Sequence, residues 1–109
     1  MTCYLQLTDE AADQLFAIAQ WYAETSQSLE IAANWYDGLL DALETLEENP
    51  HRGELAAEND LFDFELRELC YGSGKHKTHR ALYRIAGTRV EILSIRHLAQ
   101  RGLSPTDLD

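Results

Sequence analysis

The chain has 109 residues, 45% of them hydrophobic and 26% charged, which suits one soluble globular domain with a modest core. Nine Lys and Arg residues stand against nineteen Asp and Glu residues, and the formal net charge of −10 argues against non-specific binding to nucleic acid or an anionic membrane. No apolar run reaches the ~18 residues of a membrane span and no signal peptide is visible, so we expect a cytoplasmic protein.

The first half of the chain is predicted to be mostly helical. Residues 3–8 alternate enough to form a short strand. Apolar residues at three-and-four spacing then predict an amphipathic helix over about 9–25, with Thr8 as its cap. A further apolar stripe with an acidic opposite face predicts a helix over 29–48, which Pro50 ends. Two long helices joined by a few polar residues indicate an antiparallel helical hairpin.

The second half of the chain changes to strand periodicity after an irregular, polar stretch over residues 50–61. A glycine-containing basic loop over 72–78 and a short turn over 86–88 separate alternating segments. The predicted strands cover residues 62–71, 80–85 and 89–96. The order is therefore β-α-α-β-β-β, a single α+β domain over residues 1–109. We expect its N-terminal strand and helical hairpin to pack on a mostly antiparallel sheet.

Acidic and basic residues are separated along the chain, and the separation follows the change from helices to strands. Residues 1–65 hold fifteen acidic residues and one basic residue, whereas residues 66–101 hold eight basic residues and two acidic ones. This asymmetry predicts a two-faced molecule, with acidic helices and a basic three-stranded meander.

Several arginines belong to the predicted meander. Strand alternation places Arg80 and Arg84 on one face, and with Arg67 and Arg96 they form a basic strip suited to phosphate. Two other interpretations remain: the arginines pair with the acidic helices, or they are solvated. In the last strand, alternation predicts one face made of Leu93, Ile95 and His97, and an opposite face made of Val90, Ile92, Ser94 and Arg96.

The histidines of the basic segment do not predict a metal site. A structural zinc site needs four ligands, and neither Cys3 nor Cys70 lies near the histidines in sequence or matches a metal or redox spacing. We interpret both cysteines as buried thiols in a reducing compartment. His79 and His97 lie at predicted strand ends and are better candidates for a general acid or base than the loop residue His76.

Residues 66–69, 79–85 and 90–97, with the basic loop between the first two segments, resemble the RelE/ParE toxins of type II toxin–antitoxin systems. Residues 33–50 are similar to the second helix of that family. The resemblance covers nearly the whole chain and is closer to ParE-like members. It implies a toxin that is held inactive by a cognate antitoxin, whose C-terminal segment wraps it in a hetero-oligomer. It implies no cofactor.

The two branches of the family differ in mechanism, so the resemblance leaves enzymatic activity open. RelE-like members are metal-independent ribonucleases that cut mRNA in the ribosomal A site, whereas ParE-like members poison DNA gyrase. Arg80 matches the arginine that stabilises the phosphate in the nucleases. His79 and His97 are then the proton-transfer candidates. Leu69 and Leu98 stand where the nucleases carry basic residues, and the tail has no tyrosine, which favours a gyrase-binding toxin.

The basic residues are the expected contacts to the target or the antitoxin. They are Arg67, Lys75, Lys77, Arg80, Arg84 and Arg96. An acidic amphipathic antitoxin tail is expected to cover the basic meander, because opposite potentials steer association. The remaining alternatives are a ribosome-dependent ribonuclease and a non-toxic member that keeps the fold as an interaction module.

Overall fold

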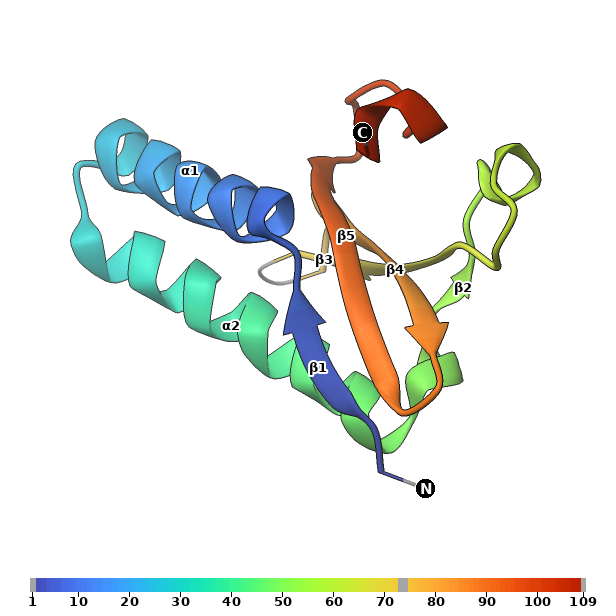
Figure 1. Ribbon diagram of the computed structural model, residues 1–109. Helices are drawn as coiled ribbons and strands as arrows, with labels where there is room; N and C mark the ends of the chain where they lie inside the picture. Colours follow the sequence, from blue (N-terminus) through green and yellow to red (C-terminus); the bar gives the residue numbers. More distant parts are fainter. Residues whose placement is uncertain (1, 73–74, 109) are drawn as a thin grey trace.

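A computed structural model describes residues 2–72 and 75–108 as one sheet with two helices on one of its faces (Figure 1). The elements are β1 (Tyr4–Leu7), α1 (Asp9–Ser26), α2 (Leu29–Glu48), β2 (Glu54–Leu55), β3 (Arg67–Tyr71), β4 (His79–Ala86) and β5 (Arg89–His97). Short 3-10 turns lie at Pro50–Arg52, Asn59–Leu61 and Pro105–Leu108. This arrangement confirms the predicted α+β class. Ser73 and Gly74 of the predicted 72–78 loop lie outside the described residues.

The helical hairpin follows from two capping side chains and one turn residue. The Thr8 hydroxyl accepts a hydrogen bond from the Ala11 amide (3.1 Å), and the Ser28 hydroxyl accepts one from the Ile31 amide (3.2 Å). Both bonds satisfy N–H groups that the first helical turn leaves without a partner. Between the helices, Gln27 has a φ of 58°, the left-handed conformation that often ends a helix. In the described ranges, neither helix is long and apolar enough to cross a membrane.

The five strands lie in the order β1-β5-β4-β3-β2. β1 runs parallel to β5, with Leu5 opposite Val90, whereas the other three pairings are antiparallel. A parallel neighbour requires a crossover connection, because a tight turn cannot return the chain to the same end of the sheet. The crossover between β1 and the antiparallel strands contains the hairpin, which therefore covers one face of the sheet.

The predicted strand over residues 62–71 is wrong in its first half, because β3 begins at Arg67. Phe62 and Phe64 lie in a loop and pack against a small core on the face of the sheet away from the helices. Alternate residues of this loop point toward the sheet, and such a pattern has the same period as a strand. The stretch predicted to be irregular contains the two-residue strand β2, which pairs with β3 at the sheet edge.

A bulge in β5 overturns the predicted division of that strand into two faces. Ser94 pairs with Leu82 and Ile92 pairs with Tyr83, so Leu93 has no residue opposite it. One inserted residue moves every following side chain to the other face. Leu93 accordingly belongs to the small core rather than sharing a face with Ile95. The helix-facing core takes its β5 side chains from Val90, Ile92 and Ile95.

Two hydrophobic cores result, one on each face of the sheet. The larger lies under the hairpin and includes Leu15, Trp35, Leu39, Leu43 and Tyr83. The smaller consists of Ala56, Leu66, Leu82, Leu93 and Leu103. The loop of residues 56–66 and the C-terminal segment therefore cover the face away from the helices. Cys3 is a buried free thiol, as predicted, whereas Cys70 is free but only half-buried.

Candidate functional site

Arg80 lies on the face away from the helices, where two carboxylates hold its guanidinium group. Its two terminal nitrogens donate to the two carboxylate oxygens of Glu58 at 2.8 and 2.5 Å, and one of them also donates to Glu68 at 3.1 Å. Arg80 is 9% exposed. The hydrogen bonds from Arg80 lower the pKa of Glu58 to about 2, and the same bonds raise the pKa of Arg80 further above its usual value. This charge is therefore satisfied within the chain.

Arg96 lies on the same face and is tied to the C-terminal segment. Its guanidinium is 3.4 Å from the Asp107 carboxylate, and it donates to the Arg101 carbonyl oxygen at 3.0 Å and to the Ser94 hydroxyl at 3.2 Å. Arg96 is 3% exposed. Asp107 also accepts hydrogen bonds from Arg101. These bonds are the main reason that the pKa of Asp107 lies well below its usual range. The C-terminal segment is thus fastened over the sheet by charged pairs.

The other two arginines of the predicted strip are paired as well. Arg67 donates to Glu65 at 2.7 Å and to the Gly53 carbonyl oxygen at 2.6 Å. Arg84 donates to Glu91 at 3.0 Å, and its guanidinium carbon lies 5.0 Å from the centre of the Phe64 ring. The acidic partners come from the 58–68 segment, from β5 and from the C-terminal turn, rather than from the acidic helices. The basic residues on the sheet therefore neutralise nearby carboxylates.

Lys75 and Lys77 differ from these arginines because both side chains are exposed. They lie in the loop between β3 and β4, on either side of the exposed His76. Over residues 2–72 and 75–108, no carboxylate is paired with either lysine within 4 Å. Of the predicted binding residues, these two lysines present charge to the solvent.

His79 and His97 meet at the ends of β4 and β5, where their ring centres are 5.1 Å apart. With Ile18, Trp21 and Tyr22 of α1, they line a cavity of about 250 Å³. Burial, and secondarily the neighbouring His97, lowers the pKa of His79 to about 4, so this imidazole is neutral at pH 7. The prediction that both histidines mark strand ends is confirmed. Their surroundings are those of an aromatic cluster.

The three residues proposed for a ribonuclease reaction do not share one face of the sheet. His79 stacks edge-on against Trp35 of α2, with ring centres 5.2 Å apart, whereas Arg80 bonds to Glu58 on the opposite face. Adjacent residues of a strand point in opposite directions, so this separation is built into their positions. A phosphate that reached Arg80 would lie across the sheet from both imidazoles.

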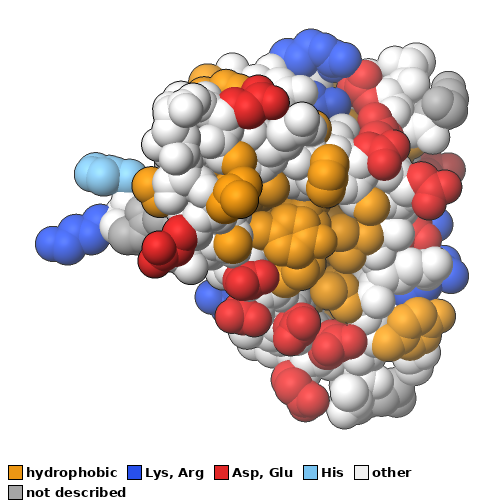
Figure 2. Space-filling model, turned by 90° about the vertical axis from the view of Figure 1, so that its left-hand side faces the viewer, with side chains coloured by type: hydrophobic (Ala, Val, Ile, Leu, Met, Phe, Trp, Pro, Cys, Tyr) orange, Lys and Arg blue, Asp and Glu red, His pale blue; other side chains and the backbone are white. Residues whose placement is uncertain are grey.

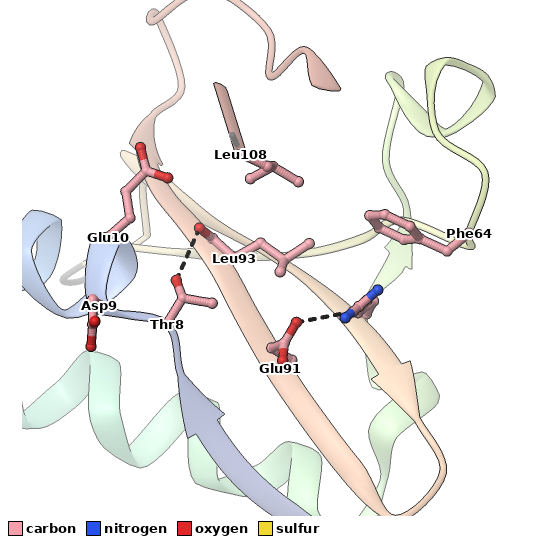
Figure 3. A pocket seen from close by; sticks show the side chains of 8 residues that line it. Thr8, Asp9, Glu10, Phe64, Glu91, Leu93 and Leu108 are labelled. Carbon is pink, nitrogen blue, oxygen red and sulfur yellow. Dashed lines mark hydrogen bonds and ion pairs between the residues drawn. The ribbon is translucent and has the colours of Figure 1, made fainter. Parts of the chain in front are cut away.

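A larger cavity of about 450 Å³ lies beside the small core and was not indicated by any sequence motif (Figure 3). Phe64, Leu93 and Leu108 point toward this space, and the Arg84–Glu91 ion pair lies at one end of it (Figure 3). Thr8, Asp9 and Glu10 complete its lining. Five separate segments of the chain contribute, so only the folded chain assembles this cavity.

The sequence also failed to identify the residues that bind the arginines. Glu58 lies in the stretch predicted to be irregular, and Asp107 lies in the tail, so no periodic pattern marked either residue. Their acidic character was visible, but their partners are far apart in the chain, at a separation of 22 residues for Glu58 and Arg80. Among the described residues, no group of three or more His, Cys, Asp or Glu residues is placed to hold a metal ion.

The fold and the paired basic face define a small α+β domain, and comparison with known proteins gives its family. A sequence model of the ParE toxin of the type II toxin–antitoxin system parDE matches residues 5–102. The chain therefore belongs to the ParE toxin family. Among solved structures, a chain of the chromosomal ParDE system from P. aeruginosa is similar, with a TM-score of 0.71 and 21% identity over 88% of this chain and 96% of that chain. Comparison with curated proteins finds no match.

Proposed function

We propose that this chain is a growth-inhibiting toxin that acts by binding DNA gyrase and is neutralised by a cognate antitoxin. Membership of the ParE family supports the toxin role and the antitoxin partner. The observation that favours target binding over RNA cleavage is the state of Arg80, which is buried between Glu58 and Glu68.

A ribonuclease needs a cation that is free to stabilise the charge that develops on the phosphate. To reach Arg80, a phosphate would have to break two hydrogen bonds from Arg80 to Glu58 and one to Glu68. It would also bring a negative charge close to both of those carboxylates. With the histidines on the other face of the sheet, the RelE-like alternative has neither its cation nor its proton-transfer group in place.

Lys75 and Lys77 are the proposed target contacts, because their charges face the solvent in the loop before β4. Arg67, Arg80, Arg84 and Arg96 then act mainly within the chain, by holding the loop of residues 56–66 and the C-terminal segment. In this proposal, four of the six predicted binding residues stabilise the domain, and two reach the partner.

A supercoiling assay with purified gyrase tests this function. Increasing amounts of toxin are expected to abolish supercoiling of relaxed plasmid, and the K75E/K77E variant is expected to need about tenfold more protein, since each reversal replaces attraction by repulsion. Arg52→Glu, a reversal at another exposed basic residue, is the matched control and is expected to inhibit like the wild type.

Full supercoiling at a large molar excess of toxin would contradict gyrase as the target. Primer extension on translated mRNA then tests the ribonuclease alternative, which requires cuts that Arg80→Ala abolishes. Unimpaired growth on expression without antitoxin, together with full supercoiling and intact mRNA, would identify the chain as a non-toxic interaction module.

A further inference from the structure

The cavity of about 450 Å³ beside the small core has no role in the proposed function. Its volume is within the range of sites that hold small organic molecules. Phe64, Leu93 and Leu108 form an apolar wall, and charged side chains stand at the two ends of this wall (Figure 3). An apolar wall between a few polar groups is the arrangement by which proteins bind and orient such molecules.

Arg84 provides one end of the cavity with hydrogen-bond donors that the fold does not use. Its Nε donates to Glu91 at 3.0 Å, and its guanidinium carbon lies 5.0 Å from the centre of the Phe64 ring. Among the described residues, its two terminal nitrogens donate no hydrogen bond. Glu91 also pairs with Arg89 at 3.5 Å, so one carboxylate faces two guanidinium groups. This end therefore carries an excess positive charge and a fork of donors that suits a carboxylate.

Glu10 provides the opposite charge at the other end of the cavity. It is the second residue of α1, its side chain is exposed, and no described residue forms an ion pair with it. Asp9 also lines the cavity and adds to the negative charge of this end. Figure 3 shows Glu10 across the space from the Arg84–Glu91 pair, with the apolar wall between them. The cavity thus presents an acceptor at one end and donors at the other.

We infer that this cavity binds a short free peptide of apolar residues, a dipeptide or a tripeptide. The ammonium group of the peptide pairs with Glu10, and its carboxylate accepts hydrogen bonds from Arg84. Its apolar side chains pack on Phe64, Leu93 and Leu108. Such a molecule carries a charge at each end and has a net charge of zero. The inference goes beyond the proposed function and does not depend on it, because neither gyrase nor the antitoxin takes part.

Other ligands leave part of the lining unused. A free amino acid carries both charges on one carbon atom, whereas the apolar wall separates the two ends of the cavity. A long-chain carboxylate would place its tail beside Glu10. It would also bring net negative charge to a protein whose helix side shows acidic side chains around its hydrophobic ones (Figure 2). An aliphatic amine would leave the donors of Arg84 unpaired, and an internal segment of a partner protein carries neither terminal charge.

The first test titrates the full chain with the dipeptide leucyl-leucine in isothermal titration calorimetry, and we expect saturable binding. N-acetyl-leucyl-leucine lacks the ammonium group, and leucyl-leucinamide lacks the carboxylate. Each modification is expected to raise the Kd about tenfold, because each removes one charge-assisted interaction. These comparisons need no variant, so they test the inference without any change to the fold.

The second test assigns each charge of the ligand to one side chain. In Glu10→Gln, acetylation of the dipeptide is expected to change the Kd less than about twofold, because the partner of the ammonium group is already lost. In Arg84→Gln, amidation is expected to have an equally small effect, for the same reason. The matched controls are Glu30→Gln, at the second residue of α2, and Arg89→Gln, which removes the other partner of Glu91 but no lining residue. Both controls are expected to respond to each modification like the wild type.

The outcomes decide the inference in either direction. Loss of the acetylation effect in Glu10→Gln and of the amidation effect in Arg84→Gln, with both effects kept in the controls, supports it. No saturable binding at millimolar leucyl-leucine, or equal affinity for the free and the modified dipeptides, overturns it. Variants that respond to both modifications like their controls place the peptide elsewhere and also overturn it. If circular dichroism shows that Arg84→Gln is unfolded, Glu10→Gln and the wild-type comparisons decide.

Discussion

At the scale of single residues, Arg80 illustrates how neighbours decide what a side chain can do. Its place in the sequence matches the phosphate-stabilising arginine of the nuclease branch of the family. In the folded chain, Glu58 and Glu68 occupy its hydrogen-bonding groups and leave it 9% exposed. The residue type and its strand position could be predicted, but its main partner Glu58 could not, because Glu58 lies in a loop without periodicity.

Replacing Glu58 with Gln is expected to lower the free energy of unfolding by about 3 kcal/mol near neutral pH, because buried Arg80 loses its main counter-charge. The pKa of Glu58 is lowered from 4.5 to about 2, chiefly by hydrogen bonds from Arg80. A lowered carboxyl pKa stabilises the fold above pH 4.5, and this contribution is lost as the pH falls toward 2. Urea titrations are therefore expected to show a difference between wild type and variant that shrinks with acidification.

The control for this prediction is Glu54→Gln, which changes an exposed carboxylate on β2. It is expected to change the free energy of unfolding by less than about 0.5 kcal/mol. A Glu58→Gln difference that stays constant from neutral pH down to about pH 2 would contradict the assigned linkage between this carboxyl and stability.

At the scale of elements, long and strongly patterned segments could be predicted well, and short ones poorly. Both helices follow from their core stripes and their caps, since each is long enough for its periodicity to be unambiguous. The strand that begins at Arg67 was extended too far because a packed loop alternates like a strand. The bulge at Leu93 left no mark in the sequence, because any residue can be the unpaired one.

Gly38 makes the contact between α2 and β3 possible. A Cβ atom at this position would lie 1.9 Å from the Tyr71 hydroxyl oxygen. Gly38→Ala is therefore expected to lower the free energy of unfolding by about 1–3 kcal/mol, since overpacking outweighs the better helix propensity of alanine. Thermal unfolding followed by circular dichroism measures the change.

The double variant G38A/Y71F tests the cause of this effect. Without the hydroxyl, the added methyl group is expected to cost much less than in the single variant, and the two substitutions should therefore be strongly non-additive in a double-mutant cycle. Additive losses would show that Gly38 is required for a reason other than its close approach to Tyr71.

At the scale of the whole molecule, the charge is separated by face rather than spread over the surface. The hairpin holds the entire excess of ten acidic residues, while the rest of the chain holds nine acidic and nine basic residues. The net charge of −10 therefore belongs to the surface of the hairpin alone. The molecule is two-faced, as predicted, but the face opposite the acidic one is neutral rather than basic.

Repulsion within the hairpin predicts that salt stabilises the protein. Raising NaCl from about 0.05 to about 0.5 M is expected to increase the free energy of unfolding by about 1 kcal/mol, because screening weakens repulsion among exposed like charges more than it weakens the buried ion pairs. Urea titrations at each salt concentration measure this increase, and D37K/D41K is expected to reduce it. Stability that falls with salt would show that exposed ion pairs dominate instead.

The sequence by itself determined the α+β class, the helical hairpin, the order of the main elements along the chain, the division of charge along the chain and the resemblance to the toxin family. These properties depend on patterns within short stretches, and local periodicity and capping express them directly. Only the tertiary structure decided that Arg80 pairs with Glu58 and that Arg96 pairs with Asp107 of the C-terminal segment. Each of these depends on which distant segments meet, and long-range contact is decided by packing of the whole chain.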